Sequence, residues 1–447
     1  MKTSTKLIIA VLILLAIAGG VYWYLFFYGP GNGTPIPTNT NNGTTGGFIP
    51  LNALGGGNQN TTGGTVGTST DENGNSNSSS TPIITETIPT LRLLSADPIG
   101  GYGASTTAST TIVRWVDRGR GNVMEARGDS EEIITLSNTV LPRIYESVWN
   151  KSVNAFVGSL LSSNNDIPTT IYAKLNIQAS STPPKTNLVS NSGSTTPETD
   201  LTKLTPYFLR GKNLPENMLT YTVSPKGDRL FMLIKESGQG AGYISNLDGT
   251  SVAKIFIQPL TQVNVEWPEE NTIAITTKGS ANQAGFLYFV NPKTGIWKKV
   301  VGPIFGISTK VSKDAKYVLV SSATRDQGIV TNIYSVGTTT PIDAVVRTLA
   351  DKCVWGNFYK ELVYCATPSQ PVSAVYPDDW YKGTVTSYDK IWQINVKNSD
   401  IRQVSSLVGQ VNQLINVFNM STDTRDDFLF FMNKDDLSFW SLDLNSR

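Results

Sequence analysis

Four hydrophobic residues recur at a constant step of 44 positions, and this repeat constrains the fold more than any other feature of the chain. They are Val223, Trp267, Val311 and Trp355, and each ends an apolar run that is followed by a polar turn and a second apolar run. A period of about 40–45 residues with four short strands in each unit is typical of β-propeller blades. The repeat therefore predicts an all-β fold assembled from consecutive blades.

The spacing of the apolar runs predicts seven blades that close into a ring. A spare apolar strand at 90–94 precedes the first unit, and the last unit contains only three strands of its own. An open propeller would leave strand edges unpaired. We therefore expect the strand at 90–94, which resembles the outer strands predicted at 345–349 and 401–404, to complete the seventh blade. The blades are expected to begin near Ile99, Tyr145, Leu219, Val263, Ile307, Cys353 and Val417.

One turn between two predicted strands carries a family resemblance. The run 224–230 reads Ser-Pro-Lys-Gly-Asp-Arg-Leu, and 312–317 is a looser copy of it. The run resembles the Ser-Pro-Asp-Gly turn of TolB-type, WD-like β-propellers, and the architectural resemblance covers about residues 90–445. It implies a binding platform more often than an enzyme. The turn itself is structural, so the resemblance implies no site.

An apolar segment at 7–28 predicts a single transmembrane helix. Its length meets the requirement of about 20 residues for a membrane span. Lys2 and Lys6 precede the segment, and no charged residue follows it until position 71. By the positive-inside rule, we expect the stub at 1–6 in the cytoplasm and everything after the segment on the other side of the membrane.

The alternative to a membrane anchor is a cleaved signal peptide. The triplet Ala-Ile-Ala at 16–18 fits a small-x-small cleavage site, but the apolar stretch continues through Tyr28, where a mature N-terminus is usually polar. Residues 29–87 are rich in Gly, Asn, Thr and Ser, so we expect a flexible linker. The predicted propeller domain is 88–447.

The composition restricts the chemistry that is open to this protein. The chain has no histidine, which excludes Ser-His-Asp and Cys-His catalysis and histidine-ligated metal sites. Its 36 basic and 35 acidic residues nearly balance, so nucleic-acid binding has no electrostatic support. We predict no cofactor, no metal and no catalytic residue. The densest acidic cluster has a spacing that matches no calcium loop and is expected to be a solvated turn; it comprises Asp423, Asp426, Asp427, Asp435 and Asp436.

The two cysteines of the chain are predicted to form a disulfide. Cys353 and Cys365 lie symmetrically about Tyr359 in a predicted hairpin, so they would face each other on neighbouring strands. In an oxidising compartment the bond would stabilise the fold by about 2–3 kcal/mol. The alternative is a pair of buried thiols in the blade. A catalytic thiol is not expected, because no histidine is present to activate it.

A long insertion at 367–388 separates the second and third strands predicted for the sixth blade. Tyrosine and tryptophan on a loop held by a rigid scaffold suit recognition. The alternative is that the aromatic rings only pin the loop to the propeller. Loops of this type share a face with the connections between blades, whereas the linker enters from the other face, so we expect the insertion to point away from the membrane. The residues predicted to bind a partner are Tyr376, Asp378, Asp379, Trp380 and Tyr381.

These features together predict a non-enzymatic, membrane-anchored propeller outside the cytoplasm. We expect it to bind a protein partner of the cell envelope and to contact the lipid bilayer through 7–28. The alternative is a histidine-free hydrolase that acts on glycans through carboxylates in the propeller funnel. Two carboxylates about 5–10 Å apart there would favour the enzyme. An apolar or filled funnel would favour the scaffold.

Overall fold

The chain divides into two compact units, Met1–Pro82 and Ile83–Arg447. The computed structural model describes residues 88–161, 168–177, 207–326, 328–411 and 413–445, all of them in the second unit. The predicted stub, anchor and linker lie outside these described residues. Within the described ranges, no helix is long and apolar enough to cross a membrane.

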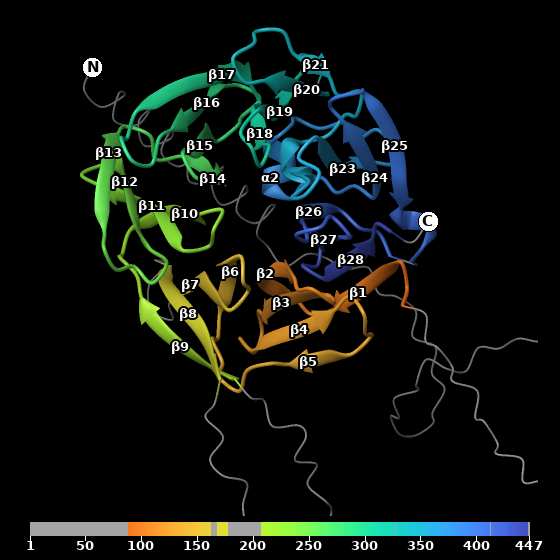
Figure 1. Ribbon diagram of the computed structural model, residues 1–447. Coiled ribbons are helices and arrows are strands. Elements are labelled where there is room, and N and C mark those ends of the chain that lie inside the picture. Colours follow the sequence, from red (N-terminus) through yellow and green to blue (C-terminus); the bar gives the residue numbers. More distant parts are fainter. Residues whose placement is uncertain (1–87, 162–167, 178–206, 327, 412, 446–447) are drawn as a thin grey trace, which may run out of the picture. The chain divides into compact units, whose positions relative to one another are not determined.

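The described part of the second unit is a ring of seven four-stranded antiparallel sheets (Figure 1), which confirms the predicted all-β propeller fold. Blade 1 contains β2 (Ile99–Thr106), β3 (Thr111–Asp117), β4 (Val123–Arg127) and β5 (Ile133–Thr135), and blade 2 contains β6 (Ile144–Trp149), β7 (Ala155–Leu160), β8 (Thr169–Ile177) and β9 (Tyr207–Asn213). Blade 3 contains β10 (Met218–Val223), β11 (Arg229–Glu236), β12 (Gln239–Asn246) and β13 (Ala253–Gln258), and blade 4 contains β14 (Val263–Glu269), β15 (Thr272–Thr277), β16 (Ala284–Val290) and β17 (Trp297–Phe305).

The remaining three blades follow the same order, and all seven begin within one residue of the predicted positions. Three short helices accompany them: η2 (Ala350–Lys352), α2 (Asp378–Lys382) and η3 (Leu407–Gly409). Blade 5 contains β18 (Ser308–Val311), β19 (Tyr317–Ala323), β20 (Ile329–Ser335) and β21 (Ile342–Asp343), and blade 6 contains β22 (Cys353–Trp355), β23 (Leu362–Pro368), β24 (Asp389–Asn395) and β25 (Asp400–Ser406). Blade 7 contains β26 (Val417–Thr422), β27 (Phe428–Asn433), β28 (Phe439–Asp443) and the N-terminal strand β1 (Leu91–Ser95).

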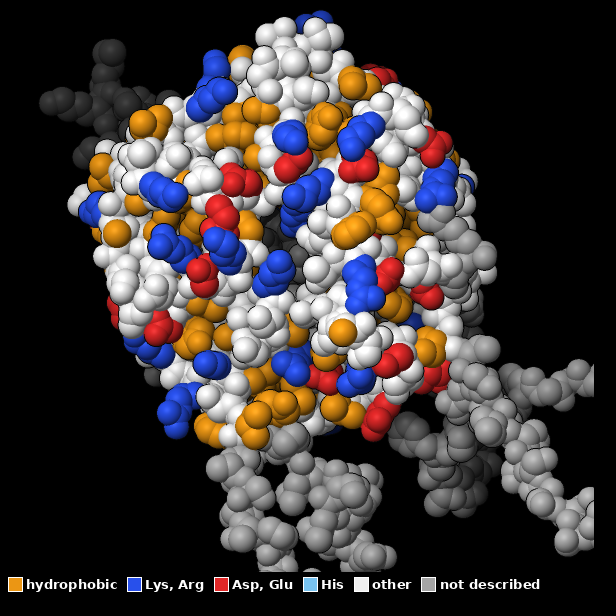
Figure 2. All heavy atoms as spheres, viewed as in Figure 1, with side chains coloured by type: hydrophobic (Ala, Val, Ile, Leu, Met, Phe, Trp, Pro, Cys, Tyr) orange, Lys and Arg blue, Asp and Glu red, His pale blue; other side chains and the backbone are white. Residues whose placement is uncertain are grey.

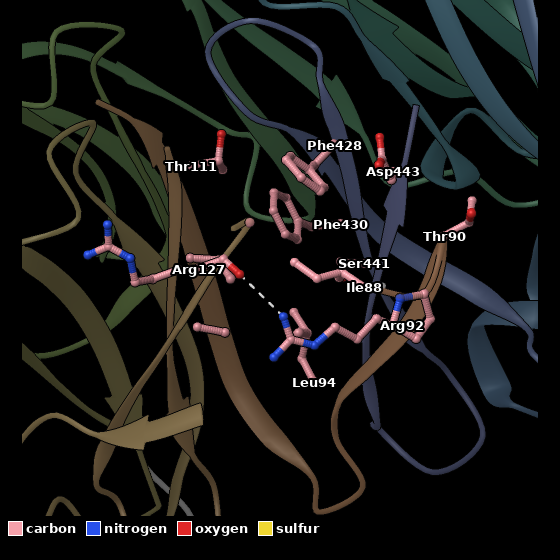
Figure 3. A pocket seen from close by; sticks show the side chains of 14 residues that line it. Ile88, Thr90, Arg92, Leu94, Thr111, Arg127, Phe428, Phe430, Ser441 and Asp443 are labelled. Carbon is pink, nitrogen blue, oxygen red and sulfur yellow. Dashed lines mark hydrogen bonds between the residues drawn. The ribbon is translucent and has the colours of Figure 1, made fainter. Parts of the chain in front are cut away.

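The N-terminal strand closes the ring as predicted. β1 pairs with β28 in antiparallel register, with Leu91 opposite Leu442, so the seventh blade has its outer strand from the other end of the domain. The Arg92 guanidinium continues this closure into blade 1 (Figure 3). It donates hydrogen bonds to the carbonyl oxygens of Arg127 at 3.2 Å, Ser130 at 2.7 Å and Glu131 at 2.6 Å. One arginine therefore connects the first and last blades.

The outer strand of blade 5 differs from the prediction. The sequence predicts it at 345–349, whereas β21 lies at Ile342–Asp343. Val345 has a positive φ of 64°, a conformation that turns the chain out of the sheet. Beyond it, the Thr348 hydroxyl donates to the Ala366 carbonyl oxygen at 2.6 Å and the Thr348 carbonyl accepts from the Thr331 hydroxyl at 2.8 Å. Val346 and Leu349 are therefore buried between blades instead of extending the edge of one.

The core lies between the blades, and the repeated tryptophans belong to it. Trp149 packs in a cluster shared by blades 1 and 2, Trp267 in one shared by blades 3 and 4, and Trp355 in one shared by blades 5 and 6. The indole Nε1 of Trp355 also donates to the Lys310 carbonyl oxygen of the preceding blade at 2.9 Å. The tryptophan that recurs in the 44-residue repeat therefore fills the space between neighbouring sheets.

The turn that carries the family resemblance has a structural role. Ser224 Oγ donates to the Asp228 carboxylate at 2.8 Å and accepts from the Arg229 backbone N–H at 3.0 Å. Gly227 has a φ of 80°, and a Cβ placed there would lie 2.5 Å from the backbone nitrogen of Lys151 in blade 2. Glycine is required because the turn both adopts a left-handed conformation and approaches the neighbouring blade closely.

Candidate functional site

The segment 369–388, called the insertion from here on, lies on the face that the sequence predicts. It joins β23 to β24, the second and third strands of blade 6, and contains the five-residue helix α2. Figure 1 shows α2 near the centre of the ring, beside β18, β23 and β26. The insertion therefore lies where the inner strands of several blades converge.

Side-chain contacts fix the insertion to blades other than its own. The Asp378 carboxylate accepts from the Ser280 hydroxyl at 2.9 Å and the Ala281 backbone N–H at 2.7 Å, which connects the insertion to blade 4. The Tyr381 hydroxyl donates to the Asp351 carboxylate at 2.8 Å, in the connection between blades 5 and 6. The contact with blade 4 joins residues 98 positions apart and passes over blade 5.

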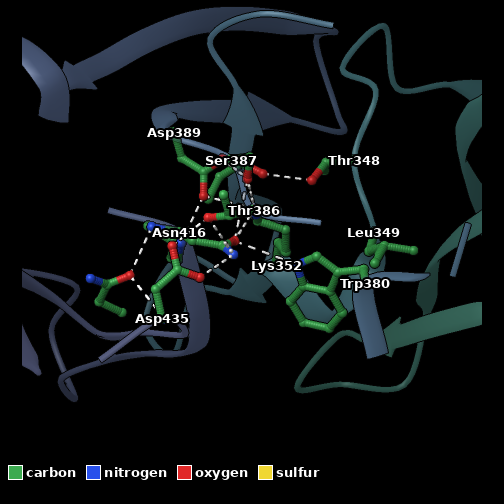
Figure 4. A network of polar contacts seen from close by, with 12 residues as sticks. Thr348, Leu349, Lys352, Trp380, Thr386, Ser387, Asp389, Asn416 and Asp435 are labelled. Atoms are coloured by element: carbon green, nitrogen blue, oxygen red, sulfur yellow. Dashed lines mark hydrogen bonds and ion pairs between the residues drawn. The ribbon is translucent and has the colours of Figure 1, made fainter. Parts of the chain in front are cut away.

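A buried polar network holds the end of the insertion (Figure 4). The Lys352 ammonium lies 2.8 Å from the Asp389 carboxylate, and these side chains are only 3% and 0% exposed. The ammonium also donates to Ser387 Oγ at 2.8 Å and to Asn416 Oδ1 at 3.0 Å, and the Trp380 indole N–H donates to the same Asn416 oxygen at 3.4 Å. All three hydrogens of the ammonium have an acceptor, which is the condition under which a buried charge is tolerated.

The predicted partner-binding residues divide into two groups. Tyr376 and Trp380 are 8% and 6% exposed and pack against Leu349 and Ala374, so the aromatic pinning considered as the alternative describes them. Asp379 caps its own loop by accepting from the Val375 backbone N–H. Asp378 is half-buried and Tyr381 is 38% exposed. A direct contact with a partner stays a prediction for these residues.

The outer surface of the insertion is polar and is formed by residues at the end of α2 and just beyond it. The sequence reasoning selected the aromatic and acidic residues of this loop and missed the smaller polar ones, because their exposure depends on which way the helix is anchored. The exposed residues at the end of α2 and just beyond it are Tyr381, Lys382, Gly383, Thr384 and Thr386.

The inner strands enclose a polar central channel, which forms the second candidate site. Figure 2 shows a hollow near the centre of this face with basic and acidic side chains around it. Two cavities of about 490 and 640 Å³ share Glu146, Val148, Lys310, Asp351 and Asn419 in their walls. The funnel is therefore neither apolar nor filled, which departs from the lining that the sequence analysis associates with a scaffold.

Charged groups in this channel perturb one another. Glu266 lies 3.2 Å from the Lys310 ammonium, and the attraction raises the lysine pKa despite the opposing effect of burial. Burial raises the pKa of Glu146. Glu146 has no hydrogen-bond or ion-pair partner among the described residues, so its carboxylate is open to a ligand.

The expected solvated turn describes Asp435 and Asp436, which are exposed, but Asp423 and Asp426 are buried and connect blades. The buried carboxylate of Asp426 accepts from three consecutive backbone N–H groups of blade 6, those of residues 357–359. Asp423 accepts from the hydroxyls of Thr106 and Thr111 in blade 1 at 2.6 and 3.0 Å. In the described part of the chain, no group of three or more acidic or cysteine side chains could hold a metal ion.

The predicted disulfide is present. Cys353 and Cys365 lie directly opposite each other on β22 and β23, with their Cα atoms 4.1 Å apart, and both side chains are fully buried. The bond closes the hairpin that directly precedes the insertion. No described cysteine is free.

Comparison with known proteins supports no assignment beyond the fold. No protein-family model and no curated protein sequence matches the chain. Among solved structures, the β-propeller domain of the Trilobed protease from Pyrococcus furiosus is 10% identical with a TM-score of 0.44, over 77% of this chain and 94% of that one. An oligogalacturonate lyase from Vibrio parahaemolyticus is 10% identical with a TM-score of 0.45, over 78% and 98% of the two chains. TolB from Acinetobacter baumannii is 10% identical with a TM-score of 0.39, over 68% and 78%.

Proposed function

We propose that the protein is a membrane-anchored binding module of the cell envelope that captures a protein partner with the outer surface of the insertion. The anchor is the apolar segment 7–28, the N-terminus is cytoplasmic, and the propeller is on the opposite side of the membrane. The observation that carries the proposal is the anchoring of one 20-residue loop to blade 4, to Lys352 at the start of blade 6 and to Asn416 at the start of blade 7 by buried and half-buried side chains.

Preorganisation is the reason for this inference. A loop that is ordered before binding loses less conformational entropy when it meets a partner, so more of the contact energy appears as affinity. Asp378 contacts blade 4, and the Trp380 indole N–H donates to the side chain of Asn416, which lies directly before the first strand of blade 7. These contacts leave the side chains of Lys382 and Thr384 exposed on a fixed backbone.

A pair of matched surface variants tests capture by the insertion. Lys382→Glu with Thr384→Arg changes the exposed surface, and Lys293→Glu with Thr294→Arg makes the same chemical change in an exposed turn of blade 4 on the opposite face. Each full-length variant is used as bait in pull-downs from envelope membranes. We expect the first variant to lose at least tenfold of the captured partner and the second to retain it. Equal capture by both variants would refute the proposed surface.

The membrane anchor needs a separate test. Deletion of 7–28 should move the protein from the membrane pellet to the soluble fraction, whereas a chain cleaved after position 18 would already be soluble. Protease added to intact cells without an outer barrier should digest the propeller of the anchored protein. Protection of the propeller under these conditions would reverse the proposed orientation.

A second candidate function is favoured by the carboxylates of the channel. Glu146, Glu266 and Asp351 line one cavity, and desolvation by the surrounding walls raises the pKa of Glu146, although its side chain stays open to the cavity; a raised pKa is what the general acid of a glycoside hydrolase requires. Glu266 is engaged by Lys310, and Asp351 accepts hydroxyl hydrogen bonds from Ser308 and Tyr381. A hydrolase would release reducing ends from envelope glycans, and Glu146→Gln would abolish that release. A binding module would release none.

A further inference from the structure

The central channel presents hydrogen-bonding groups from several inner strands. Residues two apart on a strand point to the same face, and two such pairs line the larger cavity: Thr220 and Thr222 on β10, and Asn264 and Glu266 on β14. Asn419 on β26 completes the wall. The cavity volume of about 640 Å³ falls within the range of small-molecule sites, about 300–1,000 Å³.

Several of these groups have unused hydrogen-bonding capacity. Within the described residues, the side chains of Thr220, Thr222 and Asn264 make no hydrogen bond, and neither does the Glu146 carboxylate. Polar groups that line a cavity and have no protein partner are free to form hydrogen bonds with a ligand.

The charges of the channel balance. Across the two cavities the acidic lining residues are Glu146, Glu266 and Asp351, and the basic ones are Arg118, Lys278 and Lys310. A wall with three charges of each sign produces no net field that would concentrate a polyanion or a polycation. The balance favours a ligand with no net charge that both donates and accepts hydrogen bonds.

An aromatic ring completes the lining. Tyr381 is 38% exposed and lines the larger cavity, and its hydroxyl is held by Asp351. The ring is therefore fixed in position with part of its surface open. An aromatic ring with its polar end satisfied offers a flat apolar surface on which the C–H face of a sugar ring can lie.

We propose that the channel binds a short neutral oligosaccharide. Sugar hydroxyls are donors and acceptors at once, so they match the mixed amide, hydroxyl and carboxylate lining of Asn264, Thr222 and Glu146. The sugar ring lies against Tyr381 at the insertion side of the channel. The site is that of the second candidate function, and the inference concerns binding rather than cleavage, so it stands without partner capture by the insertion.

Binding is tested with the full-length protein in detergent micelles. Isothermal titration uses chitotriose, cellotriose and maltotriose as neutral probes, and trigalacturonate and L-arginine as anionic and cationic probes. We expect saturable binding of at least one neutral trisaccharide with a Kd below 1 mM, and no saturable binding of the charged probes. Binding without release of reducing ends separates a binding site from a hydrolase.

Three variants and one control locate the site. Asn264→Ala and the isosteric Thr222→Val should each weaken binding at least tenfold, whereas Asn213→Ala on the outer strand β9 should leave it unchanged. Glu146→Gln keeps an oxygen acceptor and removes the charge, so binding of a neutral ligand should change less than threefold. Failure of all three neutral probes to bind, preferential binding of a charged probe, or full binding by Asn264→Ala and Thr222→Val would each overturn the proposal.

Discussion

Replacing the buried lysine of the insertion network provides the most stringent test of how the insertion is held. Lys352→Met removes the ammonium and leaves the Asp389 carboxylate, which is 0% exposed, without its counter-charge. Removal of one member of a buried ion pair costs about 3–5 kcal/mol, because the remaining charge stays desolvated. That is a large part of the roughly 5–15 kcal/mol that stabilises a folded domain.

The Asp389 carboxylate also limits how far the structure can compensate. Its oxygens accept from the Val417 backbone N–H at 2.7 Å and from Ser387 Oγ at 3.0 Å. These bonds hold the carboxylate inside the protein, so it cannot turn to solvent when the lysine is removed. Asp389→Asn retains an acceptor oxygen and removes the charge, and the double variant with Lys352→Met should therefore recover most of the lost stability.

Urea denaturation followed by tryptophan fluorescence measures these differences. The matched control is Arg347→Met, which removes the cation of the exposed pair Arg347–Asp343, whose side chains are 46% and 56% exposed. An exposed pair contributes about 0–1 kcal/mol. A loss below about 1 kcal/mol for Lys352→Met, or equal losses for the single and double variants, would refute the argument from buried charge.

Three further predictions concern the propeller itself. Replacing Cys353 and Cys365 by alanine should lower the free energy of unfolding by about 3 kcal/mol, read from the urea midpoint, and an unchanged midpoint would contradict the loop-closure estimate. Burial raises the pKa of Tyr102 above its ordinary value of 10.0, so the unfolded state loses this proton first as the pH rises. The free energy of unfolding should therefore fall as the pH rises above about 10. Tyr102→Phe should reduce the slope of this pH dependence, and an identical slope would refute the assignment. Arg92→Ala removes three hydrogen bonds across the ring closure and should lower the free energy of unfolding by about 1–3 kcal/mol. Hydrogen exchange should then speed up first in β1, and uniform exchange across the blades would count against a role in closure.

The architecture could be predicted from the sequence because it follows from a period. Trp267 and Trp355 mark the 44-residue step of the repeat. The extra strand before the first blade can pair only with blade 7, which has three strands of its own. The outer strand of blade 5 was misplaced for a local reason. The apolar residues at 345–349 are typical of a strand, but Val346 and Leu349 are apolar because they pack between blades, and periodicity does not distinguish these two environments.

The sites were less predictable because their residues come from many blades. The insertion was visible as a long loop, whereas its anchors Lys352 and Asn416 are ordinary polar residues in other connections. Asp423 and Asp426 have the composition of a solvated turn, yet each binds hydroxyls or backbone N–H groups of a neighbouring blade. The alternation of Thr220 and Thr222 was readable in the sequence, but not that this face points into the channel.

Tyr381 connects the two proposed sites, and this connection is testable. Its ring lines the channel, its backbone belongs to the insertion, and its hydroxyl joins the insertion to Asp351. Tyr381→Phe retains the ring and removes this bond, so the channel should keep its affinity for the trisaccharide to within threefold while exchange of the insertion amides accelerates.

The reciprocal effect follows from linkage. If a captured partner displaces Tyr381, it must weaken saccharide binding, and the saccharide must weaken capture by the same factor. Titration of the trisaccharide in the presence of saturating partner measures the first factor, and pull-down in saturating trisaccharide measures the second. Because the two factors must be equal at equilibrium, unequal factors would show that one of the measurements had not reached equilibrium. If neither ligand changes the affinity of the other, Tyr381 keeps the same position in both complexes. A side chain that belongs to both sites cannot be moved by one ligand without changing the binding free energy of the other.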